Sequence, residues 1–318
     1  MSFDRNKYFE RIGYTGQSDI SVKTLREIHA AQVFSIPFEN LAIHESKNVN
    51  NLNDFIALDE ASLFGKLIVD KRGGYCHENN ELLAIALTQI GFKVERLAAR
   101  VLTAPNLPRG HKLLLVTIDN QKWIADVGFG GYGLYEPIPL VADKEEIQYD
   151  DHFKLVINDD KYVLQFQQNN VWKNLYEFNL EKFEPVDFKP MSYHVSHAPD
   201  SFFVANRFCV MPTPKGRIIL LNEKLRIMEN GKEEVTLIKD EENYLFVLKN
   251  LFGILLPKNT VLKEHKSINI ESRNKENISQ TNNWCNQFPK AASIVSTANE
   301  INPSDNAVKS FVSTDNNI

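Results

Sequence analysis

The sequence contains no apolar run that approaches the roughly 20 residues needed to span a bilayer. Its start, Met1 to Glu10, is polar and charged, unlike a secretory signal peptide. Dense runs of lysine and arginine are also missing, and the formal net charge of −5 gives no electrostatic reason to bind a phosphate backbone. We therefore expect a cytoplasmic protein that binds neither membranes nor nucleic acid.

Cysteine is scarce, with only Cys76, Cys209 and Cys285 at wide spacing. An odd number of separated cysteines argues against a disulfide framework and indicates reduced thiols. Apolar residues make up 43% of the chain and charged residues 24%, which excludes collagen-like and mostly disordered classes. A chain of 318 residues can bury a sizeable core in two or three lobes.

Apolar residues spaced three and four apart predict amphipathic helices at 19–32, 76–90 and 241–252. Gly91 is expected to end the second helix as its C-cap. Residues after about Glu264 are rich in Asn, Ser, Lys and Thr, which predicts a flexible tail.

The middle of the sequence is typical of short strands separated by Asn and Asp turns. The predicted strands are 94–101, 112–118, 121–127, 153–157, 161–167 and 171–178. Further strands are expected at 217–221, 225–228 and 234–238, with Asn230-Gly231 as a hairpin turn. The middle third therefore favours an antiparallel sheet or barrel.

The densest chemical signal surrounds Cys76, which follows Arg72-Gly73-Gly74-Tyr75. Two glycines allow a tight backbone approach that delivers the cysteine to the first turn of the predicted helix. There the unpaired N–H groups and the positive end of the helix dipole favour a thiolate. A cysteine that was only a small buried apolar residue would gain nothing from this turn. We therefore predict that Cys76 is a nucleophile.

A cysteine nucleophile needs a base, and the base needs an orienting group. His111 opens the strand predicted at 112–118, and Asp126 lies at the end of the next strand. If Asp119-Asn120 joins these strands as a hairpin, both side chains fall at its open end, because they are about equally far from the turn. The predicted catalytic triad is Cys76, His111 and Asp126.

Asp126 leads into a glycine-rich segment, 127–133, that contains a literal Gly-x-Gly-x-x-Gly pattern. A dinucleotide site of that kind needs a helix to follow, and Pro137 and Pro139 forbid one. Two interpretations remain open: a nest of backbone N–H groups for a pyrophosphate, and a turn that closes a barrel.

His194 and His197 have a spacing that a metal ion could use on a helix. The stretch around them is not convincingly helical and no third ligand lies nearby, so we predict no metal site. His77 follows the nucleophile directly. Because neighbouring side chains on a helix diverge by about 100°, we expect His77 to point away from Cys76.

Several motifs together resemble those of the arylamine N-acetyltransferase family. The stretch 72–80 is similar to the nucleophile motif of that family and 126–130 to its aspartate motif, with His111 between them as the family's histidine is. Further similarity covers Tyr8 to Tyr14, Ile36 to Leu41, Ser201 to Asn206 and Gly216-Arg217. The chain departs from the family at His77, where an apolar residue is usual, and at Gly110, where a small polar residue is usual.

The resemblance implies an α+β fold with a cysteine-protease-like catalytic core. An N-terminal helical bundle with the catalytic cysteine is expected at 1–90. A central antiparallel β-barrel with the catalytic histidine and aspartate is expected at 91–188, and a C-terminal α/β lid at 189–264. The polar tail would occupy 265–318.

The resemblance also implies a ping-pong reaction, in which Cys76 takes an acetyl group from acetyl-CoA and passes it to an arylamine, a hydrazine or a related nitrogen nucleophile. Acetyl-CoA would be a co-substrate, with no tightly bound cofactor. Carried over by position, the residues at the CoA site would be Gly110, Gly128, Phe129 and Gly130. The apolar wall of the acceptor site would be formed by Phe38, Phe129 and Phe203. Glu39 and Arg72 resemble a pair that braces the nucleophile loop.

Three other functions remain open. Cys, His and Asp occur in the same chain order in cysteine hydrolases and transglutaminase-like enzymes. An amide synthase could use the same scaffold with a larger acyl carrier. A non-catalytic binding protein could recruit partners through the tail.

Overall fold

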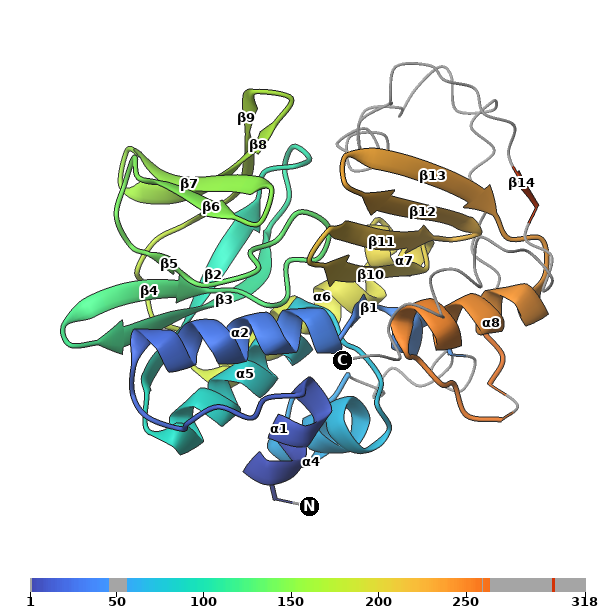
Figure 1. Ribbon diagram of the computed structural model, residues 1–318, viewed down its shortest axis with the longest axis horizontal. Helices are drawn as coiled ribbons and strands as arrows, with labels where there is room; N and C mark the ends of the chain where they lie inside the picture. The colour runs from blue at the N-terminus through green and yellow to red at the C-terminus, as the bar shows by residue number, and fades with distance from the viewer. Residues whose placement is uncertain (1, 46–55, 259, 264–298, 301–318) are drawn as a thin grey trace.

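The computed structural model describes residues 2–45, 56–258, 260–263 and 299–300. A group of helices packs beneath a β-barrel, and a second sheet lies to the right of the barrel (Figure 1). The chain is therefore α+β, with a helical N-terminal region, as predicted. No helix within these residues is long and apolar enough to cross a bilayer.

The N-terminal helices surround the segment that carries Cys76. They are α1 (Arg5–Ile12), α2 (Val22–Ser35), α3 (Leu41–His44), α4 (Glu60–Leu63), a π-helical turn (Phe64–Val69) and α5 (Cys76–Ile90). Helix α5 has the predicted bounds, and Gly91 closes it with a φ of 111°. Only glycine adopts that conformation without strain.

Helix α2 is shifted along the chain from its predicted position at 19–32. It begins after Ser21, whose hydroxyl accepts a hydrogen bond from the Thr24 N–H (3.1 Å) and so caps the first turn. Ile20 therefore lies outside the helix, where it is exposed. The helix continues to Ser35 because Pro37, and not the end of the apolar pattern, terminates it.

The barrel is a nearly closed antiparallel sheet of eight strands in the order β5-β4-β3-β2-β9-β8-β7-β6. Its strands are β2 (Lys93–Val101), β3 (Arg109–Ile118), β4 (Gln121–Ala125), β5 (Ile138–Pro139), β6 (Glu145–Gln148), β7 (Asp151–Asn158), β8 (Lys161–Gln168) and β9 (Val171–Phe178). The predicted turn joins β3 to β4, with Asp119 and Asn120 at φ values of 48° and 62°. The predicted hairpin is therefore confirmed, although β4 ends at Ala125 rather than at residue 127.

Strand β3 is apolar on both faces because each face packs against a different core. Leu113 and Leu115 point into the barrel, whereas Leu114 and Val116 pack against the N-terminal helices. Alternate residues of a strand point to opposite sides, so a strand between two cores reads as a continuous apolar run. This packing fixes the end of β3, and with it His111, against α5.

The second sheet has the order β1-β10-β11-β12-β13-β14. Its strands are β1 (Phe38–Glu39), β10 (Phe208–Thr213), β11 (Gly216–Leu221), β12 (Lys224–Glu229), β13 (Lys232–Leu237) and β14 (Asn299–Glu300). The hairpin predicted at Asn230-Gly231 is confirmed between β12 and β13. Helix α8 (Glu241–Phe252) follows with its predicted bounds.

The predicted flexible tail, 265–318, lies outside the described residues except for β14. Those two residues pair parallel to β13, with Thr236 opposite Asn299.

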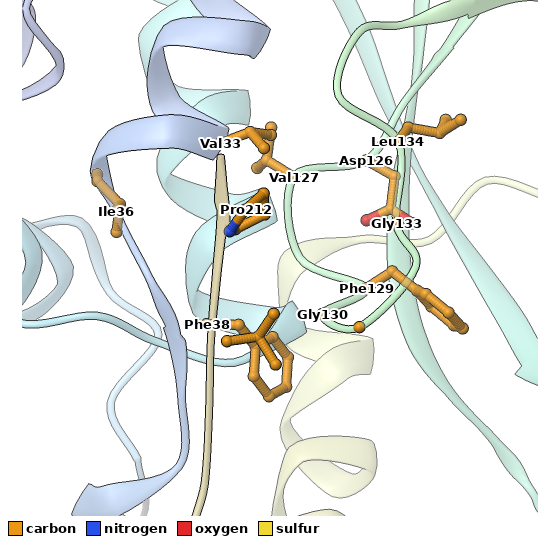
Figure 2. A pocket seen from close by; sticks show the side chains of 12 residues that line it. Val33, Ile36, Phe38, Asp126, Val127, Phe129, Gly130, Gly133, Leu134 and Pro212 are labelled. Carbon is orange, nitrogen blue, oxygen red and sulfur yellow. The ribbon is translucent and has the colours of Figure 1, made fainter. Parts of the chain in front are cut away.

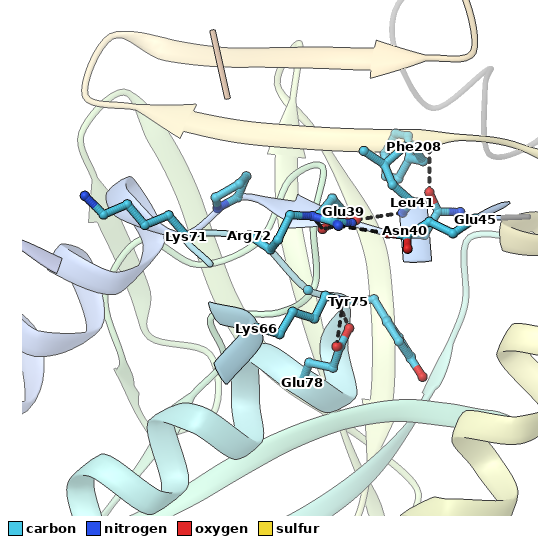
Figure 3. A network of polar contacts seen from close by, with 12 residues as sticks. Glu39, Asn40, Leu41, Glu45, Lys66, Lys71, Arg72, Tyr75, Glu78 and Phe208 are labelled. Atoms are coloured by element: carbon cyan, nitrogen blue, oxygen red, sulfur yellow. Dashed lines mark hydrogen bonds and ion pairs between the residues drawn. The ribbon is translucent and has the colours of Figure 1, made fainter. Parts of the chain in front are cut away.

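Strand β1 comes from the N-terminal region but belongs to the second sheet, where it pairs with β10. Asn40 fixes this connection (Figure 3). Its amide nitrogen donates to the carbonyl oxygens of Phe203 (2.8 Å) and Asn206 (2.7 Å), and its amide oxygen accepts from the Phe208 N–H (2.7 Å). The segment that follows β1 is therefore held by residues 203–208, at the start of β10.

The stretch around His194 and His197 is helical, so the prediction that it lacks a helix is wrong. Helix α6 (Phe188–His197) follows a short 3-10 turn (Pro185–Asp187) and precedes α7 (Phe202–Ala205). Its buried residues are Phe188, Ser192 and Ser196. Packing of this face outweighs the weak intrinsic propensity of the sequence. No group of three His, Cys, Asp or Glu side chains that could hold a metal occurs among the described residues.

Candidate active site

Cys76 is the first residue of α5, as predicted, and Tyr75 is the N-cap. Glu78 reaches back to accept a hydrogen bond from the Tyr75 N–H (3.1 Å). Its carboxylate also forms an ion pair with Lys66 (2.7 Å). A Cβ at Gly73 would lie 2.3 Å from the Pro37 carbonyl oxygen. Only glycine at position 73 therefore allows this loop to lie so close to Pro37.

Glu39 and Arg72, the predicted pair, are in direct contact (Figure 3). The Arg72 Nε donates to Glu39 Oε1 (2.9 Å), and its Nη1 donates to Glu45 Oε1 (2.8 Å). Burial would raise the pKa of Glu39, but the charges of Arg72 and Lys66, with the Leu41 N–H, outweigh burial and lower it. The guanidinium thus ties the loop before Cys76 to β1 and to the residue after α3.

His111 and Asp126 meet at the open end of the β3–β4 hairpin. The His111 Nε2 lies 2.7 Å from Asp126 Oδ2, and both side chains are buried. This bond leaves Nδ1 of the ring for the sulfur of Cys76, which interacts with the ring by a hydrogen bond and by charge. The Cys76 thiol also lies 3.7 Å from the carbonyl oxygen of Gly110, the residue before the histidine. The structure therefore brings Cys76, His111 and Asp126 together.

Contacts between the side chains determine the charges of His111 and Asp126. Burial alone would lower the pKa of His111, but Asp126 and then Cys76 raise it to about 10. Burial likewise would raise the pKa of Asp126, and the His111 charge together with hydrogen bonds lowers it. The arrangement holds an imidazolium against a carboxylate at neutral pH. Because the pKa of His111 is raised, its stabilising contribution is complete below pH ~6.5 and is lost as the pH rises through about 10.

Asp126 also makes hydrogen bonds with neutral groups. Asn80 Nδ2 (2.9 Å) and the Gly128 N–H (3.0 Å) both donate to Oδ1. The backbone N–H of Asp126 donates to His29 Nε2 (3.0 Å). Sequence reasoning did not identify Asn80 or His29 as site residues. Asn80 lies in the nucleophile motif, one turn of helix after Cys76, and that spacing could have indicated it; nothing in the sequence distinguishes His29 from a buried helix residue.

The predicted CoA-site and wall residues lie around the triad. A Cβ at Gly128 would lie 2.8 Å from the Cys76 Cα, so only glycine allows this loop to pack on the nucleophile. The Phe129 ring meets the His111 ring edge-on at 5.3 Å. Phe38 lies beside Gly130 and 5.7 Å from the Phe203 ring.

A cavity of about 20 Å³ lies between the glycine-rich loop, α2 and β10, with Phe38 and Phe129 in its lining (Figure 2). It has room for about one water molecule. The glycine-rich loop therefore packs closely against α2 and β10 at this point.

His77 is fully buried between the rings of Tyr75 (5.4 Å) and Phe188 (5.9 Å). Burial and the Lys112 charge lower its pKa well below the usual value, so the ring is neutral. Neither ring nitrogen has a hydrogen-bond partner among the described residues. The ring is therefore a polar group in an apolar position.

Replacing His77 with Phe is expected to raise the free energy of unfolding by about 1–3 kcal/mol, because a ring of similar shape would remove two unpaired buried polar atoms. Urea unfolding of both proteins measures the difference. His152→Phe is a suitable control, since that ring is about one-third exposed and contacts Glu145. A loss of stability on the His77 replacement would indicate that its ring nitrogens have partners.

A cysteine at a helix N-terminus, facing a histidine and an aspartate on an antiparallel barrel, defines the class of enzymes with a cysteine-protease-like core. Comparison with known proteins narrows this class. A family model described as N-acetyltransferase matches residues 21–261. The arylamine N-acetyltransferase of Escherichia coli (strain K12) is 34% identical over 254 residues, which cover 78% of this chain and 88% of that protein.

Solved structures give the same result. The arylamine N-acetyltransferase of Mycobacterium marinum in complex with CoA matches with a TM-score of 0.73 and 31% identity, over 79% of this chain and 93% of that one. The enzyme from Salmonella typhimurium matches with a TM-score of 0.75 and 31% identity, over 82% and 96% of the two chains. The chain belongs to the arylamine N-acetyltransferase family and is an acyltransferase.

Proposed function

We propose that this protein transfers an acetyl group from acetyl-CoA to arylamines, hydrazines and related nitrogen nucleophiles through an acetyl-cysteine at Cys76. The observation that carries this proposal is the hydrogen-bonded pair of His111 and Asp126 (2.7 Å) beside Cys76, whose sulfur lies 3.7 Å from the carbonyl oxygen of Gly110, the residue before His111. The family relationship supports the donor and the arylamine acceptor. Hydrazine acceptors, a cytoplasmic location and the absence of membrane or nucleic-acid partners are proposed from the sequence alone.

In the first half-reaction the Cys76 sulfur attacks the thioester carbonyl of acetyl-CoA, while the imidazolium of His111 holds a proton beside it. The new S–C bond forms as the C–S bond to CoA breaks, and the proton goes to the departing CoA thiolate. Exchanging one thioester for another is close to isoenergetic, so positioning and stabilisation of the oxyanion contribute most. The Cys76 backbone N–H, unpaired at the helix terminus, is the proposed oxyanion donor.

In the second half-reaction the amine attacks the acetyl-cysteine carbonyl. His111, now neutral, takes the proton from the amine nitrogen, and the Cys76 thiolate leaves. Asp126 keeps the ring oriented and stabilises the imidazolium that forms again. We propose that Gly110, Gly128, Phe129 and Gly130 border the CoA site, that Phe38, Phe129 and Phe203 line the acceptor site, and that Glu39 and Arg72 brace the nucleophile loop.

Mixing the protein with acetyl-CoA in the absence of an amine tests the first step. We expect a burst of CoA stoichiometric with protein and a mass increase of one acetyl group on Cys76, discharged when an arylamine is added. Cys209→Ala is the matched control, because Cys209 is also a buried free cysteine but lies outside the triad. Cleavage of peptides without CoA release would instead support a cysteine hydrolase, and activity that survives Cys76→Ala would exclude covalent catalysis at this residue.

A further inference from the structure

His29 has no role in the proposed reaction, although it lies next to the triad. It lies on α2, is fully buried, and contacts the backbone of Asp126 rather than the side chains of the triad. We propose that His29 is a positioning residue, which holds the Asp126 carboxylate in line with His111 through a hydrogen bond to the Asp126 backbone. This inference rests on the proposed function, because it deepens the role of the same triad.

The hydrogen-bond partners determine the tautomer of His29. The Asp126 N–H can only donate, so Nε2, 3.0 Å away, must accept and carries no proton. The proton is therefore on Nδ1, which donates to the Tyr135 carbonyl oxygen at 2.8 Å. Burial lowers the pKa of His29 to about 4, although the hydrogen bond to the Tyr135 carbonyl and the charge of Asp126 oppose this effect, so the ring stays neutral at physiological pH. A doubly protonated ring could not accept from Asp126.

The two bonds also enclose the glycine-rich loop. Asp126 and Tyr135 stand at its two ends, and the rigid ring of His29 links both to α2. Within this loop the Gly128 N–H donates to Asp126 Oδ1, and Phe129 lies against His111. A shift of the Asp126 backbone would therefore move the carboxylate and the Phe129 ring together.

Two helices hold the side chain and the backbone of Asp126. Asn80 on α5 donates to Asp126 Oδ1 and accepts from the Val127 N–H (2.9 Å), and the Gly128 N–H donates to the same carboxylate oxygen. His29 on α2 accepts from the Asp126 N–H itself. Loss of His29 therefore leaves the carboxylate bound to α5 but releases the backbone N–H of the residue that carries it.

Three substitutions separate the two hydrogen bonds of His29. In His29→Gln the side-chain oxygen reaches the place of Nε2 and keeps an acceptor for the Asp126 N–H. In His29→Asn the side-chain nitrogen reaches the place of Nδ1 and keeps a donor for the Tyr135 carbonyl. His29→Phe keeps the ring and neither bond. Each variant is assayed for acetylation of Cys76 in a single turnover with acetyl-CoA, at a temperature well below its own thermal midpoint.

We expect His29→Asn and His29→Phe to acetylate Cys76 about 10- to 100-fold more slowly than the wild type, and His29→Gln to stay within about threefold. His29→Gln and His29→Asn each remove one hydrogen bond, so a merely structural role would affect both variants alike. Rescue by Gln but not by Asn would therefore show that the bond to the Asp126 N–H is the one that matters. If His29→Phe does not fold, the comparison of Gln with Asn alone decides. Equal rates in these two variants, or a wild-type rate in His29→Asn, would overturn the role of His29. A wild-type protein that is not acetylated would instead refute the proposed function.

Discussion

Asp126→Asn is expected to slow acetylation of Cys76 by about 10⁴-fold without loss of the fold. The reason is the direction in which the new amide would point. Oδ1 of Asp126 accepts from both Asn80 Nδ2 and the Gly128 N–H. An amide oxygen can keep these two bonds and an amide nitrogen cannot, so the nitrogen would occupy the position of Oδ2, facing His111.

A donor at that position would reverse the His111 tautomer. Nε2 would have to accept from the amide, which leaves the proton of a neutral ring on Nδ1, the nitrogen that faces Cys76. The ring could then neither take a proton from the thiol nor form a charge-stabilised imidazolium.

Single-turnover acetylation and the rate of Cys76 alkylation by iodoacetamide measure the effect, with circular dichroism to verify the fold. Asp119→Asn is a matched control on the same hairpin, because this residue is exposed and its φ of 48° suits asparagine. We expect the control to retain its rate. A loss of less than tenfold in Asp126→Asn would show that the carboxylate does not orient the ring.

The proximity of Cys76, His111 and Asp126 could be predicted from the sequence because each part depends on local structure. Gly73 and Gly74 with the apolar spacing after Cys76 define a helix N-terminus, and the Asp119-Asn120 turn sets which residues pair across the hairpin. In the structure Ile118 pairs with Gln121 and Leu114 with Ala125, and this register leaves His111 and Asp126 beyond the last pair. Short-range rules are sufficient for such features.

The rest of the site depends on contacts between distant segments. His29 is 97 residues from Asp126 in the sequence, and Phe38 pairs with Val210 on a strand far along the chain. A histidine on the buried face of α2 has the same local pattern whether or not it binds the triad. The helix around His194 and His197 was missed for a related reason, since packing of Phe188 and Ser192 stabilises it more than its intrinsic propensity does.

Charges buried beneath the nucleophile helix form another feature that the sequence did not reveal. Glu81 on α5 makes two hydrogen bonds with Arg96 on β2, at 2.8 and 2.6 Å. It also accepts from Lys112, at 2.9 Å. Lys112 is fully buried beside His111 in the chain, and its ammonium lies 4.2 Å from the centre of the Phe188 ring. Burial lowers the pKa of Lys112, and the charge of Glu81 opposes this effect.

Glu81→Leu is expected to lower the free energy of unfolding by about 3–5 kcal/mol, because it leaves the Lys112 ammonium buried without a counter-charge. The double variant Glu81→Leu/Lys112→Met should recover most of this loss, since a buried ion pair is often no more stabilising than apolar side chains of similar volume. Urea unfolding of the two single variants and the double variant gives the coupling energy directly.

Lys23→Ala is the exposed control. The Lys23–Glu27 pair on α2 has a similar distance, 2.9 Å, but its lysine side chain is 80% exposed, and we expect a change of no more than ~0.5 kcal/mol. Burial, rather than the presence of an ion pair, would then account for the difference between the two sites. If Glu81→Leu costs as little as Lys23→Ala, water or another group must reach the Lys112 ammonium, and the base of α5 would be less tightly packed than its contacts indicate.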